Sequence, residues 1–287
     1  MRVFVTGGTG FIGRHFIAEA ATLGFKITAT CRTPSARNSQ IPTSSWINVQ
    51  LDALPKGTLA GTDVLVHLAA SGVSPKHASR EEMTYWNVLV TQKLLEQAHA
   101  EGVKRVVVAG SFAEYGRSAE RYDLIPPDAP LLPTSAYAAS KAACFATCHA
   151  TALELALEIC YLRVFSAFGE GQSEANLWPA LRKAALAGSD FRMTAGEQIR
   201  DFVDVRHVAR SFTHACLRDD VSPNTPRIWN VGSGNPRAIR DFATEWWTNW
   251  GARGSLLLGA LPYRANEVMR FAPLITEHTP IVGAQSA

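Results

Sequence analysis

The sequence lacks any apolar run long enough to cross a membrane and any block of like charges. Even Val103–Ala109 includes two cations, so no window approaches the ~18 uninterrupted apolar residues of a membrane-spanning helix. Only 18% of the residues are charged and the formal net charge is +3, which disfavours nucleic acid as a partner. The short apolar start at Val3 is followed by glycines and by no cleavage site for a signal peptidase. We therefore expect a cytoplasmic protein without a membrane segment.

Paired cysteines are also missing. The five cysteines are odd in number and contain no CxxC pair, which excludes a disulfide framework and a zinc ribbon. Cys144, Cys148 and His149 lie within an alanine-rich helical stretch that has no second pair of metal ligands. We expect reduced, buried thiols and no metal site.

What the chain does contain is an alternation of short β-branched runs with helical patterns. The expected strands are Arg2–Thr6, Lys26–Thr30, Val64–Leu68, Arg105–Ala109, Glu158–Phe165, Asp201–Val205 and Arg227–Val231. The expected helices are Arg14–Leu23, Glu82–Glu101, Ala136–Glu154, Leu177–Ala187, Val208–Leu217 and Ile239–Trp250. This order predicts an α/β protein with a Rossmann-type, doubly wound parallel sheet. We expect a dinucleotide-binding domain over 1–165, joined by parts of 201–234, and a smaller interwoven substrate-binding lobe, mainly over 166–287.

A glycine-rich turn follows the first strand. Gly7, Gly10 and Gly13, with Phe11 and Ile12 between them, stand where a strand passes into a helix. Glycines in that position let backbone N–H groups approach a pyrophosphate, and the positive end of the helix favours its charge. The bare spacing also occurs in ordinary tight turns. Its place behind an N-terminal strand favours an NAD(P) site.

The end of the second strand bears on which dinucleotide binds. NAD-preferring Rossmann proteins carry an acid there for the ribose 2′-hydroxyl, whereas this chain has Cys31-Arg32. An arginine can pair with a 2′-phosphate through charge-assisted hydrogen bonds. We expect NADP, with NAD as the alternative. Arg32 could instead stack on the adenine or lie in solvent.

Tyr137 and Lys141 stand four residues apart and share one face of a predicted helix. The lysine ammonium can lower the pKa of the phenol, and Ser111 follows a buried strand earlier in the chain. Reduction of a carbonyl needs a proton donor and a second donor for the developing charge. The plainer alternatives are a strand-end cap for Ser111 and a buried aromatic for Tyr137.

Ordered motifs extend this pattern along most of the chain. They are GGTGFIG from Gly7, His67–Ala70, SFAEYG from Ser111, YAASK from Tyr137, RVFSAFGEG from Arg163, RDFVDV from Arg200, NVGSG from Asn230 and RANEV from Arg264. With them the sequence resembles the extended short-chain dehydrogenase/reductase family, and within it the nucleotide-sugar epimerases, dehydratases and ketoreductases. The resemblance implies that Tyr137 is the general acid/base, that Lys141 holds the nicotinamide ribose and that Ser111 hydrogen-bonds the reacting oxygen.

The same resemblance implies further cofactor contacts. It places Asp52 and Ala53 beside the adenine, and it places Asn87 on a helix near the cofactor. Asp52 could equally be a turn residue and Asn87 a helix-surface amide. The remaining implied contacts, around the phosphates and riboses, are Leu68, Ala69, Ala70 and Val164.

The reaction is narrowed by one segment. Sugar 4,6-dehydratases of the family carry Thr-Asp-Glu where this chain has Ser111-Phe112-Ala113. Glu114 stands one place further on, and on an extended segment it should point elsewhere. We therefore reject a dehydratase. Arg32 favours NADPH, and the SFAEYG segment, the run from Gly196 to Phe202 and the run from Tyr263 to Glu267 resemble reductases of nucleoside-diphosphate deoxyhexoses. The resemblance therefore implies an NADPH-dependent 4-ketoreductase of a nucleoside-diphosphate 4-keto-6-deoxyhexose. The alternatives are an NAD-dependent C4 epimerase, which uses the same side chains, and a non-catalytic dinucleotide-binding protein.

A nucleoside-diphosphate sugar needs cations or amides around its phosphates. The resemblance assigns this role to Asn176, Arg200 and Arg264, and it places Ser166 near the sugar, where many relatives carry asparagine. Arg200 could instead pair only with Asp201 or Asp204. The resemblance also implies a homodimer formed through the helices Glu82–Glu101 and Ala136–Glu154.

Overall fold

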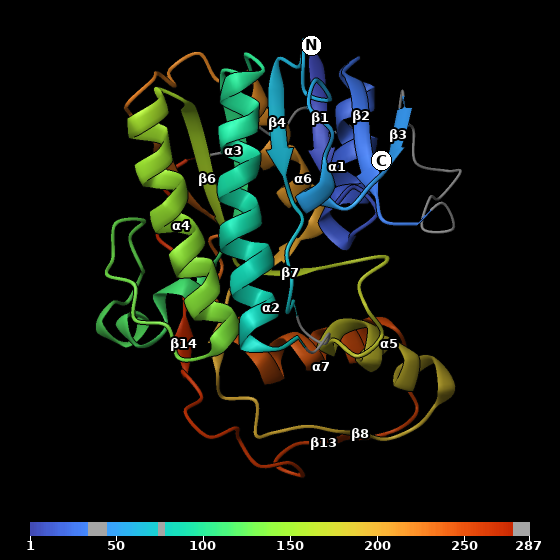
Figure 1. Ribbon diagram of the computed structural model, residues 1–287. Coiled ribbons are helices and arrows are strands. Elements are labelled where there is room, and N and C mark those ends of the chain that lie inside the picture. Colours follow the sequence, from blue (N-terminus) through green and yellow to red (C-terminus); the bar gives the residue numbers. More distant parts are fainter. Residues whose placement is uncertain (34–44, 74–77, 278–287) are drawn as a thin grey trace.

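A seven-stranded parallel sheet forms the centre of the computed structural model, which describes residues 1–33, 45–73 and 78–277 (Figure 1). The strand order is β11-β6-β5-β4-β1-β2-β3, and every neighbouring pair is parallel. The bounds are β1 Arg2–Thr6, β2 Lys26–Cys31, β3 Ser45–Asn48, β4 Val64–His67, β5 Arg105–Ser111, β6 Glu158–Val164 and β11 Arg227–Val231. The expected doubly wound α/β fold is confirmed.

Helices cover both faces of the sheet, as crossover connections between parallel strands require. The helices α1 (Phe11–Thr22) and α6 (Val205–Leu217) pack together on one face. On the other face, α3 (Val90–Ala100) packs against α4 (Ala136–Leu155). No helix among the described residues is long and apolar enough to cross a membrane.

The helix expected over Glu82–Glu101 is divided into three pieces. The first is α2 (Arg80–Thr84), which begins at a capping box formed by Ser79 and Glu82. It continues into a π-helical turn, η3 (Tyr85–Leu89), and then into α3. Such widened turns are rare in proteins, and those that occur are often found at functional sites. Here the turn carries Asn87, which is buried.

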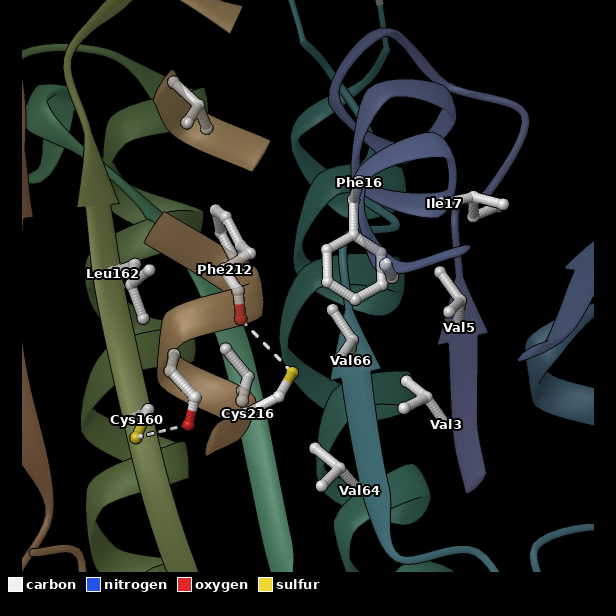
Figure 2. Packing of buried hydrophobic residues seen from close by; sticks show 14 of the residues in the cluster. Val3, Val5, Phe16, Ile17, Val64, Val66, Cys160, Leu162, Phe212 and Cys216 are labelled. Carbon is white, nitrogen blue, oxygen red and sulfur yellow. Dashed lines mark hydrogen bonds between the residues drawn. The ribbon is translucent and has the colours of Figure 1, made fainter. Parts of the chain in front are cut away.

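The apolar core on the α1/α6 face is continuous from helix to sheet. Figure 2 shows the Phe16 ring of α1 pointing toward Val66 of β4, with Phe212 of α6 between Phe16 and Leu162 of β6; Ile17 belongs to the same cluster. Phe16, Ile17 and Phe212 are fully buried. This packing fixes the start of α1 relative to the carboxyl ends of the strands.

All five cysteines are free thiols, and all are buried, as expected. Cys160 and Cys216 belong to the core in Figure 2, where their sulfurs donate to the Ala215 and Phe212 carbonyls. Cys144 and Cys148 lie on α4 with their sulfurs 4.0 Å apart. Cys31 ends β2.

The second half of the chain alternates between the large sheet and a smaller group of elements. Strand β11 and helix α6 return to the sheet, whereas α5 (Leu177–Ala187) and α7 (Ile239–Asn249) pack against each other below it (Figure 1). The short strands are β7 Ser166–Phe168, β8 Phe191–Arg192, β9 Ile199–Arg200, β10 Phe202–Asp204, β12 Arg237–Ala238, β13 Leu256–Leu257 and β14 Arg270–Phe271. The expected domain boundaries stay a prediction.

The strand order reverses direction at β1, because β2 lies on one side of it and β4 on the other. In open α/β sheets, ligands bind beyond the carboxyl ends of the strands at such a switch point. The glycine turn after β1 and the segment after β4 meet there.

Candidate active site

The glycine turn after β1 has room for no side chain at two of its positions. Gly7 has a positive φ of 72°, and a Cβ on it would lie 2.6 Å from the Ala69 nitrogen. A Cβ on Gly13 would lie 2.2 Å from the Gly7 carbonyl oxygen. Gly10 is the N-cap of α1 and offers no side-chain cap to the first-turn N–H groups. Phe11 and Ile12 occupy that first turn, so the turn presents backbone donors at a helix N-terminus.

The segment after β4 closes against this turn and is held by Asn87. The Asn87 side chain accepts from the Ser71 nitrogen at 2.7 Å, donates to the Ser71 carbonyl at 3.0 Å and donates to the Ser140 hydroxyl of α4 at 2.9 Å. Asn87 is therefore no surface amide. Leu68 and Ala69 are half-buried and Ala70 is exposed.

His67, at the end of β4, lies between two threonines. Its Nδ1 is 2.7 Å from the Thr6 hydroxyl and its Nε2 is 3.0 Å from the Thr91 hydroxyl. Complete burial, with a smaller contribution from Lys141, lowers the pKa of His67 to about 3. The imidazole is neutral at physiological pH and serves as a spacer between β1, β4 and α3.

Ser111, Tyr137 and Lys141 converge at the carboxyl end of β5. Ser111 is the last residue of β5, and its hydroxyl lies close enough to the Tyr137 phenol to lower the pKa of that phenol. Lys141, one turn further along α4, is buried and donates from Nζ to the Ala109 carbonyl at 2.7 Å. The three residues predicted from the sequence are thus brought together by one strand and one helix.

Burial dominates the electrostatics of the tyrosine. It raises the pKa of Tyr137, while the Lys141 charge and the Ser111 hydrogen bond lower it. The ammonium does lower the phenol pKa, as expected, but without overcoming burial. For Lys141, burial disfavours the charged form, yet Cys144, Tyr137 and Glu114 outweigh it and the pKa is raised. Lys141 is therefore a permanent cation beside the phenol.

Glu114 lies directly behind Ser111. Residues Phe112–Tyr115 form a 3₁₀ turn, η4, and not the extended segment that we expected. The Glu114 side chain does point away from the site, because it turns into the core and pairs with Arg163 at 2.7 Å; the two side chains are 0% and 1% exposed. Sequence reasoning missed this pair. The Ser-x-x-Glu spacing of a capping box could have indicated the contact between Glu114 and Ser111, but no sequence signal indicated the pairing with Arg163.

The residues expected at the adenosine end lie apart from this cluster. Arg32 follows β2 and is exposed. Asp52 and Ala53 form a 3₁₀ turn, η2 (Leu51–Ala53), and Asp52 accepts from the Tyr85 hydroxyl at 2.9 Å. Val164, a further expected cofactor contact, lies instead beside the cluster, because it ends β6 and pairs in register with Ser111.

The expected substrate residues are spread over the second half of the chain. Ser166 begins β7, and its nitrogen donates to the Asp201 carbonyl at 3.0 Å. Asn176 is the N-cap of α5, and its side chain makes no capping hydrogen bond. Arg264 is exposed.

Arg200 is buried, and its partner is neither of the acids we considered. Its guanidinium donates to Glu267 at 2.7 Å and to the Val268 carbonyl at 2.8 Å. Asp201 instead accepts from the Ser233 and Gly234 nitrogens, and Asp204 caps α6. The expected alternative of pairing with Asp201 or Asp204 is wrong. Arg200 is fixed beside the segment that carries Arg264.

A sequence profile described as the NAD dependent epimerase/dehydratase family matches residues 3–232. The chain belongs to this family. The resemblance identified from the motifs is thereby confirmed, and the protein is an enzyme of the nucleotide-sugar epimerase/dehydratase type.

Members of the family with known activities resemble the chain over most of its length. It is 26% identical to the UDP-glucose 4-epimerase of Corynebacterium glutamicum over 265 residues, 84% of this chain and 78% of the relative. The structure of MoeE5 in complex with UDP-glucuronic acid and NAD is 29% identical, with a TM-score of 0.83 over 96% of this chain and 90% of that one. The UDP-N-acetylglucosamine 4-epimerase from Methanobrevibacter ruminantium M1, in complex with UDP-N-acetylmuramic acid, is 25% identical, with a TM-score of 0.85 over 96% and 89%.

Proposed function

We propose that this family member is an NAD-dependent C4 epimerase of a nucleoside-diphosphate sugar. The observation that carries the proposal is the joint placement of Ser111, Tyr137 and Lys141 at the end of β5, beside the segment that closes on the glycine turn. It revises our expectation of an NADPH-dependent 4-ketoreductase. Relatives of this chain include UDP-sugar 4-epimerases, and the solved structure of MoeE5 contains NAD.

The residues at the switch point suit a dinucleotide. Gly7 and Gly13 let the turn pack tightly against Ala69 and against its own backbone, and this packing sets the N–H groups at the start of α1, where the helix N-terminus supplies positive potential for a pyrophosphate. Lys141 uses one of its three N–H donors on Ala109, which leaves two for the hydroxyls of the nicotinamide ribose. When bound, NAD supplies the chemistry of taking up the hydrogen of C4 with its electron pair and giving it back.

Tyr137 carries the proton in this proposal. Its phenolate, which burial disfavours and the Lys141 charge favours, accepts the proton of the sugar C4 hydroxyl when C4 is oxidised, and the phenol returns the proton when the opposite face of the ketone is reduced. Lys141 stabilises the phenolate by charge, and the Ser111 hydroxyl donates to the C4 oxygen. The reaction has no net proton transfer or redox change, because the proton and the hydrogen of C4 are both removed and returned within one turnover.

Phosphate binding is assigned to the second half of the chain. Asn176 stands at the start of α5 and its side chain makes no capping hydrogen bond, and Arg264 is exposed. Arg200, whose guanidinium is buried and paired with Glu267, acts on the diphosphate by orienting the segment that carries Arg264. Ser166 is assigned to the sugar.

A reductase is the second candidate, and Arg32 is the observation that favours it. No acid stands at the end of β2 to exclude a 2′-phosphate, which suits NADP. The chain is also 24% identical to the dTDP-6-deoxy-L-talose 4-dehydrogenase (NAD(+)) of Aggregatibacter actinomycetemcomitans.

Two parallel incubations distinguish an epimerase from a reductase. The purified protein is given NAD and UDP-glucose, and the appearance of the C4 epimer is followed by chromatography, with absorbance monitored for net NADH. A parallel reaction contains NADPH and a dTDP-4-keto-6-deoxyhexose. We expect epimerisation without net cofactor change, and a loss of about 100-fold or more in Tyr137→Phe. NADPH oxidation without epimerisation would overturn the proposal in favour of the reductase. NAD binding without any turnover would leave a non-catalytic protein.

We also infer a homodimer through α3 and α4. The supporting observation is that Leu89 and Leu153, on this side of the molecule, are 48% and 45% exposed. Light scattering should give twice the 31.1 kDa chain mass, and Leu153→Glu should reduce it.

A further inference from the structure

We propose that Glu114 is a positioning residue, which holds the Ser111 backbone N–H so that the Ser111 hydroxyl faces Tyr137. The inference rests on the proposed function for the meaning of Ser111. It concerns a residue outside the Ser111, Tyr137 and Lys141 set, and one that touches no reacting atom.

Both oxygens of Glu114 are committed. Oε1 accepts from the Ser111 nitrogen at 2.7 Å and from the Tyr161 hydroxyl at 2.9 Å. Oε2 accepts from Arg163 Nε at 2.7 Å. The carboxylate is thus fixed by strand β6, which supplies Tyr161 and Arg163, and it passes that constraint to the last residue of β5.

The Ser111 hydroxyl keeps its proton available for a partner outside the turn. Its oxygen accepts from the Ala113 nitrogen at 3.2 Å, and the neighbouring Tyr137 phenol, whose pKa Ser111 lowers, is a partner to which that proton can be donated. If the Ser111 N–H lost its acceptor, the backbone at the end of β5 could rotate and the hydroxyl would lose this direction.

Tyr161 extends the same constraint to α4. Its hydroxyl lies 3.3 Å from the Lys141 carbonyl as well as against Glu114. Its ring fills the space beside Gly110, where a Cβ would lie 2.3 Å from the ring. One carboxylate therefore sets both the strand that carries Ser111 and the helix that carries Lys141.

An ordinary helix cap does not account for this arrangement. The capped element, η4, is only four residues long. The side chains of Glu114 and Arg163 are 0% and 1% exposed, and burying a charged pair has a desolvation cost that apolar residues would avoid. We infer that the buried Glu114 carboxylate serves to align the neighbouring Ser111, and that this role explains why such a costly group is buried here.

The test compares two double variants that differ only in the acceptor for Ser111. E114Q/R163M removes both charges and keeps an amide oxygen for the Ser111 N–H. E114M/R163M has nearly the same volume and offers no acceptor. Both avoid leaving an unpaired buried charge. Glu158→Gln breaks the Arg105–Glu158 pair and serves as a control for losing an ion pair away from the site.

We expect kcat of E114M/R163M to lie on the order of 10- to 100-fold below that of E114Q/R163M, within the range for a displaced transition-state donor. NAD affinity and KM should differ by less than about threefold between them, since ground-state binding is untouched. Equal kcat values would overturn the proposal. If E114M/R163M does not fold, Glu114→Asp, whose shorter side chain withdraws from Ser111, must show the same loss.

A second readout does not depend on turnover. The groups that act on the Tyr137 phenol are Lys141 and Cys144 from its own helix, Ser111 from β5 and Glu114 from η4. Burial raises the Tyr137 pKa and the Ser111 hydrogen bond lowers it. Tyr137 ionisation, read as phenolate absorbance after subtraction of the matching Tyr137→Phe variant, should therefore need a higher pH in E114M/R163M than in E114Q/R163M.

Adding Ser111→Ala to both double variants should abolish that difference. A difference that persists would overturn the proposal, because it could not pass through the serine. A protein that turns over no nucleotide sugar yet shows the shift would refute the proposed function and keep the positioning role.

Discussion

Substituting Gly13 by alanine would separate the geometry of the phosphate turn from the stability of the fold. The added methyl carbon would lie 2.2 Å from the Gly7 oxygen and 2.9 Å from the Gly8 Cα, and both atoms belong to the backbone. Because non-bonded atoms pack at ~3.5 Å, the turn would have to open by about 1 Å. That opening moves the N–H groups that we assign to the pyrophosphate.

Gly8→Ala is the matched control within the same turn. Its methyl would lie 2.9 Å from Cδ1 of Ile17 and 3.1 Å from Cβ of Ala29. The first contact is the end of a flexible side chain, and both lie on the core side of the turn. The strain should therefore appear in stability and not in cofactor binding.

Overpacking typically costs about 1–3 kcal/mol. If this strain lowers the free energy of NAD binding by the same amount, the Kd for NAD rises roughly 5- to 150-fold. Calorimetric titration with NAD should show this for Gly13→Ala and a change of less than about threefold for Gly8→Ala. Thermal unfolding without NAD should show a smaller loss of stability for Gly8→Ala, whose methyl meets the flexible end of Ile17, than for Gly13→Ala, whose methyl meets backbone atoms. Unchanged NAD affinity in Gly13→Ala, with the fold intact, would refute the assignment of the pyrophosphate to this turn.

Three further predictions concern other parts of the site. Arg32→Asp should weaken NADP relative to NAD by about tenfold or more, because a carboxylate repels the 2′-phosphate; equal Kd ratios before and after would contradict this. The pKa of His67 is lowered to about 3 in the fold, against ~6.5 unfolded, so the unfolded state binds the extra proton and stability falls as pH drops from 6.5 toward 3. Unfolding free energies measured with urea at several pH values should fall with decreasing pH by up to about 1.4 kcal/mol per pH unit more in the unsubstituted protein than in His67→Asn. The same pH dependence in both proteins would argue against a lowered His67 pKa. Asn87→Ala leaves the Ser71 N–H without its acceptor and should lower the free energy of unfolding by about 1–3 kcal/mol. It should also weaken NAD binding; a loss of stability with unchanged NAD affinity would contradict the assignment of Asn87 to the cofactor site.

Much of the fold could be predicted from the sequence, because β-branched runs such as Arg105–Ala109 alternate with long amphipathic stretches. The strand β3 could not, since Ser45–Asn48 is a four-residue edge strand without such a run. The division of the Glu82–Glu101 helix was also invisible, because the π-helical turn depends on the contacts of Asn87 with Ser71 and Ser140. Local sequence patterns predict which segments form helices and strands, whereas tertiary contacts determine where these elements become irregular.

The candidate site divides in the same way. Ser111, Tyr137 and Lys141 follow from motif order, since the ends of neighbouring parallel strands and their helices meet at one edge. The partners of the arginines do not follow. Arg163 pairs with Glu114 across 49 positions, and Arg200 pairs with Glu267 across 67. Only the folded chain brings such residues together, whereas sequence reasoning considered the neighbouring Asp201 and Asp204.

The burial of every cysteine has a practical consequence. Thiol-directed reagents need an accessible sulfur, and the native protein presents none at its surface. A single cysteine introduced at an exposed position, such as Leu186 at the end of α5, would therefore be modified selectively without removal of the native five. A fluorophore attached there would report how α5 moves when a nucleotide sugar binds, in an otherwise unaltered enzyme.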